Sequence, residues 1–193
     1  MHDALLRSPL ADFLGRQTRD LLVDGRPCSL AEIPFVDMLV LRGDAGDPDF
    51  AQAVRDASGL HLPHKPNSAS IDPQRQLLWL GPDEWMLKLR DRQGPAVMAA
   101  LQDGLQGKHS AVVDVGHGST TLLLQGPASA DLLARGCPLD LHPRVFPTGA
   151  LAQSHIAKAS ATVLCLYAGI QYEITVRRSF ADYLARWLCE AGS

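Results

Sequence analysis

The chain has 193 residues, of which 46% are hydrophobic and 20% charged, and its formal net charge is −3. These values are ordinary for a globular protein and fit one compact domain or two small ones that share a core. The sequence shows no basic stripe typical of nucleic-acid binding, no apolar run of about 18 residues that could span a membrane and no secretory signal pattern. We therefore expect no nucleic-acid partner, no membrane contact and a cytoplasmic location.

The four cysteines are too widely spaced for a CxxC motif of a zinc or thioredoxin-like site. We expect reduced thiols that behave as small buried hydrophobic side chains, because disulfides are rare in the cytoplasm. The four residues are Cys28, Cys137, Cys165 and Cys189.

Residues 1–34 have the character of an N-terminal arm and not of a domain core, because Pro9, Pro27 and Pro34 interrupt them. A small apolar cluster lies near the start of the arm, formed by Leu5, Leu6, Leu10, Phe13 and Leu14. Such a cluster needs a surface on which to dock. The sequence leaves two surfaces open, the chain's own domain and a partner protein.

The next segment predicts a buried strand over 36–43 and then a helix. Asp47 can cap that helix and Pro48 suits its first position. The apolar side chains of Phe50, Ala53, Val54 and Ala57 recur at helical spacing. Gly59 suits the stop of the helix. A turn-rich stretch, a short strand over 68–71, a hairpin over 76–89 and a helix from Pro95 to about Gly107 complete this half.

The second half repeats this order of predicted elements. A strand over 120–126 is followed by a helix from Pro127 to Gly136, a turn-rich stretch over 137–149, and a strand and hairpin over 150–176. Ser179 can cap the last helix. The apolar positions of that helix recur at i, i+3, i+4, i+7 and i+8, namely Phe180, Tyr183, Leu184, Trp187 and Leu188.

An offset of 83 residues places LVLRG over LLLQG, pairs the remaining elements in order and brings Trp85 near Tyr172. We therefore predict an α+β fold of two tandem β-α-β-β-α (ferredoxin-like) repeats with antiparallel sheets that share a core, because two such units can bury their sheet faces together. The predicted domains are the arm over 1–34 and a domain over 35–193, with repeat one over 35–107 and repeat two over 110–191.

The most motif-like stretch, SAVVDVGHGST over 110–120, places Asp114, His117 and Ser119 within six residues. A nucleophile needs an elbow and partners from elsewhere in the fold, and three neighbours on one strand and turn cannot easily converge. The spacing also lacks the G-x-G-x-x-G pattern of a dinucleotide site. We interpret the stretch as a turn in which Gly116 and Gly118 supply positive φ angles.

Other chemical groups are isolated in the sequence. His61 and His64 are three residues apart, but the prolines around them exclude a helix and no Cys or carboxylate cluster accompanies them. Asp83 and Glu84 are adjacent, so on a strand they point to opposite faces and cannot form an acid/base pair.

Trp79 and Trp85 flank that carboxylate pair and are expected to anchor a core or an interface. We assign no catalytic, cofactor-binding or metal-binding residue.

Several segments together resemble one known family. They are EIPFVDMLVLRGD, LPHKPNS, LWLGPDEWMLKL, VVDVGHGSTTLLLQGPASADLLARGCPLDLHPRVFP and RSFADYLARWL. In this combination and order they resemble the gamma subunit of heterotetrameric sarcosine oxidase over about residues 30–190.

The resemblance implies a complex of four different subunits that oxidatively demethylates sarcosine to glycine, forms hydrogen peroxide and passes the one-carbon unit to tetrahydrofolate. It implies FAD, FMN, NAD, zinc and tetrahydrofolate on partner subunits and no cofactor on this chain. The implied partners are the alpha, beta and delta subunits, chiefly alpha. The apolar residues of the N-terminal arm add the hypothesis that the arm acts as a strap on the alpha subunit. The implied role of this chain is structural.

The family is similar in fold to the folate-binding aminomethyltransferases, which use the same duplicated unit. Their catalytic acid would be expected in the segment after the turn-rich stretch, here residues 150–166, and that segment contains no Asp or Glu. The KGCYxGQE-type signature of a related folate-binding branch is also absent. Two alternatives stay open: a subunit of a related N-methyl amino acid dehydrogenase complex, and a stand-alone folate-binding one-carbon domain.

Overall fold

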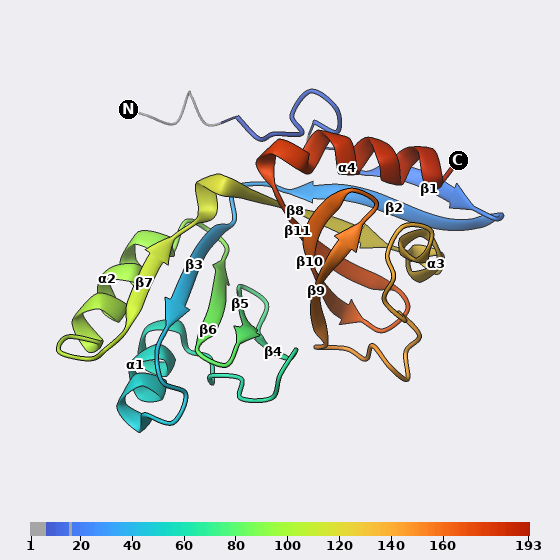
Figure 1. Ribbon diagram of the computed structural model, residues 1–193. Coiled ribbons are helices and arrows are strands. Elements are labelled where there is room, and N and C mark those ends of the chain that lie inside the picture. The colour runs from blue at the N-terminus through green and yellow to red at the C-terminus, as the bar shows by residue number, and fades with distance from the viewer. Residues whose placement is uncertain (1–6, 16) are drawn as a thin grey trace. The chain divides into compact units, whose positions relative to one another are not determined.

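The computed structural model describes residues 7–15 and 17–193 and divides into two compact units. Unit 1 combines Met1–Pro34 with Gly118–Thr148 and Ala152–Ser193, and unit 2 combines Phe35–His117 with Gly149–Leu151. Each unit is built around one antiparallel sheet (Figure 1).

Unit 2 carries a five-stranded sheet in the order β4-β5-β6-β3-β7. Its elements in chain order are β3 (Asp37–Arg42), α1 (Pro48–Ser58), β4 (Ala69–Ile71), β5 (Arg75–Gly81), β6 (Glu84–Leu89), α2 (Gly94–Gly104) and β7 (Ala111–Asp114).

Helix α1 begins and ends where its capping residues indicate. The Asp47 side chain accepts a hydrogen bond from the Asp49 N–H at 2.9 Å, and Pro48 occupies the first turn. Gly59 closes the helix in the left-handed conformation with φ 74, which costs glycine no steric energy. The predicted boundaries of this helix are confirmed.

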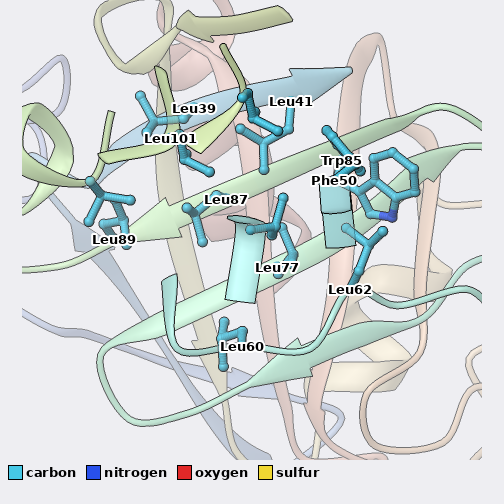
Figure 2. Packing of buried hydrophobic residues seen from close by; sticks show 13 residues of the cluster. Leu39, Leu41, Phe50, Leu60, Leu62, Leu77, Trp85, Leu87, Leu89 and Leu101 are labelled. Carbon is cyan, nitrogen blue, oxygen red and sulfur yellow. The ribbon is translucent and has the colours of Figure 1, made fainter. Parts of the chain in front are cut away.

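Figure 2 shows the core of unit 2, where leucines from the sheet meet side chains from both helices. The rings of Phe50 and Trp85 pack with centroids 5.7 Å apart. Gly43 allows this packing, because a Cβ at that position would lie 2.4 Å from the Phe50 ring.

Unit 1 carries a six-stranded sheet in the order β1-β2-β8-β11-β10-β9. Its elements are β1 (Arg19–Val23), β2 (Arg26–Ile33), β8 (Ser119–Gln125), α3 (Ser129–Ala134), β9 (Leu151–Ile156), β10 (Ala159–Tyr167), β11 (Gln171–Arg177) and α4 (Arg178–Ala191).

The two sheets confirm the predicted duplication. Without β1, the order β9-β10-β11-β8-β2 of unit 1 matches β4-β5-β6-β3-β7 of unit 2 element by element. The strand register agrees as well: Trp85 is the partner of Leu41, and Tyr172 is the partner of Leu124. The 83-residue offset carries Leu41 onto Leu124, so the two aromatic residues occupy equivalent buried positions.

The repeats exchange one strand each. β2 precedes β3 in the chain but pairs with β8, whereas β7 precedes β8 but pairs with β3. The units therefore differ from the predicted division into repeats over 35–107 and 110–191. The strand β2, which lies before the first repeat in the chain, completes the sheet of unit 1, and β7, which lies directly before β8, completes the sheet of unit 2. The local sequence pattern could not predict this exchange, because the alternation of a strand shows which face is buried and not which strand pairs with it.

The structure also differs from the predicted arm over 1–34. Residues 19–33 form β1 and β2 of the unit 1 sheet, while Leu5 and Leu6 lie outside the described residues. Leu10 and Leu14 are 0% and 6% exposed. These two side chains are therefore used within unit 1 and are not available to a partner.

Helix α4 corrects two further predictions. It begins at Arg178, and its N-cap is Arg177 without a side-chain cap, so the proposed cap at Ser179 is wrong. Its buried face consists of Ala181, Leu184, Ala185, Leu188 and Cys189. Phe180 and Tyr183, expected on that face, are 42% and 36% exposed, because the small alanines face the sheet in their place.

Candidate functional site

A cleft of about 720 Å³ opens in unit 2 where β3 ends. Its walls come from the β3–α1 loop, the β5–β6 turn and the segment that leads into β7. The lining residues are Arg42, Gly43, Asp44, Ala45, Asp47, Phe50, Pro82, Asp83, Lys108, His109, Ser110 and Ala111.

The cations of this cleft are already paired with carboxylates. The Lys108 ammonium lies 2.6 Å from an Asp49 oxygen and 3.0 Å from an Asp47 oxygen. Both hydrogen bonds raise the pKa of Lys108, and the bond to Asp49 has the larger effect. The hydrogen bond from Lys108 in turn lowers the pKa of Asp47. The Arg42 Nε donates to Glu84 at 3.0 Å, and this bond raises the pKa of Arg42.

The Lys108 contact has a counterpart in unit 1. Arg26, at the start of the exchanged strand β2, pairs at 2.7 Å with Asp131 in the first turn of α3. Lys108 precedes the exchanged strand β7 and pairs with acids at the start of α1. We interpret both pairs as clamps between an exchanged strand and a helix. Lys108 was not predicted, although the 83-residue offset places it within one residue of the position equivalent to Arg26.

Over the described part of the chain, the cleft has no exposed Phe, Tyr or Trp ring on which a flavin or a folate could stack. Small-molecule pockets usually combine an apolar and aromatic lining with a few polar groups, and here five of the twelve lining residues carry a charge. Its aromatic residue, Phe50, is only 1% exposed and packs into the core. His109 and Ser110 both line the cleft, but among the described residues no hydrogen bond joins their side chains as a base and nucleophile would require.

The GHGS stretch forms a structural turn. The Asp114 carboxylate accepts a hydrogen bond from the Gly116 N–H at 2.9 Å, His117 is exposed in a 3-10 turn, η2 (Gly116–Gly118), and Ser119 begins β8. The prediction of positive φ angles is wrong, because neither glycine of the turn has one. Gly116 is instead in a tight position, where a Cβ would lie 3.3 Å from the Met38 nitrogen.

The structure also places the remaining residues singled out in the sequence. His61 and His64 are exposed in the loop after α1. Over residues 7–15 and 17–193, no three His, Cys, Asp or Glu side chains gather as a metal site would require, and no helix is long and apolar enough to cross a bilayer.

Asp83 lies in the β5–β6 turn and Glu84 begins β6, as expected of a polar hairpin turn. Trp85 is fully buried and donates its Nε1–H to the Pro63 carbonyl at 2.9 Å, so it anchors the core. Trp79 is half-buried against the same core.

The four cysteines are free and buried, as predicted. Burial raises the pKa of Cys165 to about 11 and also raises the pKa values of Cys28 and Cys189. A reactive cysteine needs thiolate character and access. These thiols are therefore structural.

The comparisons with known proteins agree with the resemblance seen in the sequence. The model of the "Sarcosine oxidase, gamma subunit family" matches residues 42–193. The sarcosine oxidase subunit gamma of Corynebacterium sp. (strain U-96) is 33% identical over 191 residues, which cover 98% of this chain and 91% of that protein.

Two solved structures are similar to this chain, the first over nearly its full length and the second in fold alone. A chain of the heterotetrameric sarcosine oxidase from Corynebacterium sp. U-96, in complex with pyrrole 2-carboxylate, has a TM-score of 0.87 at 30% identity and covers 97% of this chain and 94% of that chain. The glycine cleavage system aminomethyltransferase T from Bartonella henselae has a TM-score of 0.59 at 19% identity over 82% of this chain and 44% of that chain, which shows a shared fold. The family match, the full-length identity and the fold lead to one conclusion: the chain belongs to the sarcosine oxidase gamma-subunit family.

Proposed function

We propose that this chain is a non-catalytic assembly subunit of a heterotetrameric sarcosine-oxidising complex. The observation that carries the proposal is the likeness to one chain of a heterotetrameric sarcosine oxidase, with a TM-score of 0.87 and coverage above nine-tenths of both chains. The overall reaction would be the oxidative demethylation of sarcosine to glycine, with peroxide formation and one-carbon transfer to tetrahydrofolate.

The chemistry of the described residues supports a division of labour between subunits. In the cleft of unit 2, Lys108 already pairs with Asp47 and Asp49, and no exposed Phe, Tyr or Trp ring of the described residues lines the cleft. The proposal therefore places FAD, FMN, NAD, zinc and tetrahydrofolate on the alpha, beta and delta subunits, with alpha as the main neighbour. It places the complex in the cytoplasm, which the four free cysteines support.

Co-expression tests this assignment. The tagged chain, produced together with alpha, beta and delta subunits of the same source, should co-purify with flavin absorbance and sarcosine-dependent peroxide formation. Purified alone, it should show neither. Flavin or sarcosine oxidation on the isolated chain would contradict a non-catalytic role, and failure to co-purify would contradict the assembly role.

A stand-alone folate-binding role is the first alternative. The fold shared with the aminomethyltransferase shows the scaffold alone, and residues 150–166 supply no carboxylate. Calorimetric titration of the isolated chain with tetrahydrofolate separates the two roles. Micromolar binding would correspond to about −8 kcal/mol; we expect no heat and no thermal shift.

A related N-methyl amino acid dehydrogenase complex is the second alternative, because another chain would select the substrate. The reconstituted complex can be compared on sarcosine and on N-methylglutamate. A higher kcat/KM on sarcosine with oxygen as acceptor supports the proposed function. The opposite preference would assign the chain to the dehydrogenase complex.

A further inference from the structure

Helix α4 leaves an aromatic flank at the surface of unit 1. Phe180, Tyr183 and Trp187 recur at i, i+3 and i+7 and therefore share one side of the helix; we call them the α4 aromatic flank. Trp187 packs so closely on Gly136 that a Cβ there would lie 2.3 Å from its ring. Phe180 and Tyr183 continue this row outward, edge to face with ring centroids 6.4 Å apart.

The opposite flank of α4 is already covered by the chain's own N-terminal segment. Arg186 lies 4.4 Å from the centroid of the Phe13 ring and also pairs with Asp182 at 2.8 Å. Arg178 donates to the Arg7 carbonyl at 2.9 Å. Figure 1 shows the described part of this segment, drawn in blue, beside α4. The N-terminal segment therefore covers one side of the helix, and the aromatic rings lie on the other.

The β9–β10 turn fixes the edge of the α4 aromatic flank. Ala157, with φ 51, donates its N–H to the Gly136 carbonyl at 2.8 Å. The next N–H, of Lys158, donates to the Tyr183 hydroxyl at 3.4 Å. A non-glycine residue with positive φ persists only where its surroundings hold it. The turn therefore places Lys158 beside Tyr183 while its side chain stays exposed.

Two cations adjoin this flank and form its rim: Lys158, whose backbone N–H bonds the Tyr183 hydroxyl, and Arg177, the N-cap of α4 three residues before Phe180. Lys158 and Arg177 are both exposed, and no carboxylate among the described residues pairs with either of them. The nearest acid on α4, Asp182, is already engaged by Arg186. This local excess of positive charge contrasts with the net charge of −3 of the whole chain.

We propose that the α4 aromatic flank with Lys158 and Arg177 is a docking surface for a partner subunit that presents carboxylates around an apolar contact. The inference rests on the proposed function, because it names the surface by which the chain joins its complex. Rigid aromatic side chains supply contact area at low entropic cost and are enriched among the residues that dominate interface energetics. A second copy of this chain fits less well, since a two-fold contact would set the same cations against each other.

Two variants of the full chain test the surface in the assembled complex. Phe180→Ala with Tyr183→Ala removes the rings, and Lys158→Glu with Arg177→Glu reverses the rim charge. Among the described residues, neither of the two cationic side chains makes a hydrogen bond or an ion pair that the second variant would remove. The affinity for the co-expressed partner subunits is measured at low and high salt. We expect the first variant to weaken binding by about 10-fold to 100-fold at both salts. The second should weaken it mainly at low salt.

The matched control is Tyr167→Ala, which removes another exposed aromatic side chain of unit 1, 63% exposed. Tyr167 lies at the far end of the nine-residue strand β10, about 30 Å along the strand from Lys158 at about 3.3 Å per residue. Its affinity should equal that of the wild type. Thermal unfolding of all three variants checks that the fold is retained.

Each outcome of the binding assay decides a different point. If the wild type binds the partner subunits and both the aromatic variant and the charge variant bind equally well, the docking surface is wrong while the proposed function stands. If the wild type does not bind them, both proposals fail. If it instead forms a dimer that the aromatic variant dissociates, a second copy occupies the flank and our choice of partner is overturned.

Discussion

Gly126, which follows β8, is the position where a single methyl group should disturb the exchanged strand β2. Its φ is +133, and an added Cβ would lie 2.6 Å from the Cys28 Cα and 2.7 Å from the Pro27 oxygen. Both contacts are backbone atoms of β2, so no side-chain rotation can relieve them. Gly126→Ala therefore tests whether β2 lies against the end of β8, its antiparallel neighbour in the sheet.

The expected loss has two sources. A non-glycine residue in this φ region costs about 1–3 kcal/mol, and displacing packed neighbours to accommodate a methyl group costs about 1–3 kcal/mol more. The sum of about 2–6 kcal/mol is a large part of the stability of about 5–15 kcal/mol that is typical of a domain.

Urea unfolding followed by circular dichroism measures the effect. With a slope of about 2 kcal/mol per molar urea, the midpoint should fall by about 1–3 M. The control is Gly118→Ala, because Gly118 has open space around its Cβ position and no positive φ; we expect its stability to change by less than about 0.5 kcal/mol. If both variants unfold at the wild-type midpoint, Pro27 and Cys28 do not lie against Gly126 and the described exchange is wrong.

Three further predictions concern the duplicated cores and the clamp. Trp85→Phe and Tyr172→Phe should each lower the free energy of unfolding by about 1–3 kcal/mol in urea titrations, because each leaves a buried carbonyl without its donor. Cys165, with its pKa of about 11, should react with Ellman's reagent at pH 8 far more slowly in the native protein than in urea. Lys108→Met should destabilise the protein at neutral pH and not in acid, measured by thermal unfolding across pH. The lowered pKa of Asp47 stabilises the fold above the ordinary carboxyl pKa of about 3.9, and this contribution is lost as pH falls through the lower folded-state pKa.

Each of these three predictions has a distinct contrary result. A larger loss for Trp79→Phe, whose ring is half-buried, than for Trp85→Phe would contradict the buried tether to Pro63. Labelling of native Cys165 as fast as that of the unfolded chain would show that its thiol is accessible. An equal effect of Lys108→Met at every pH would mean that the Lys108 stem matters through packing and not through its charge.

The sequence alone determined the local elements and their repetition. Capping residues and helical spacing located α1 with its ends at Asp47 and Gly59, and the turn chemistry of Gly-Pro-Asp located the β5–β6 hairpin. The 83-residue offset identified the duplication, since two copies of one pattern leave the same order of local signals. The motif-like GHGS stretch was correctly interpreted as a turn, although its glycine conformations were not.

The candidate site was less predictable from the sequence. Lys108 and Asp49 are 59 residues apart in the chain, and neither belongs to a motif that announces a contact. The cleft that Lys108 borders exists because strand and helix ends converge there, which periodicity does not encode.

Only the tertiary structure decided which strands pair and which apolar side chains stay outside. β2 and β7 have ordinary strand patterns, but a strand's alternation specifies its faces and not its neighbours, so the exchange was invisible until the sheets were assembled. The same limit applies to α4. Helical spacing grouped Phe180 and Tyr183 with the core, yet the sheet accepts the small faces of Ala181 and Ala185 and leaves the two rings at the surface. Packing geometry, which depends on both surfaces at once, made that choice.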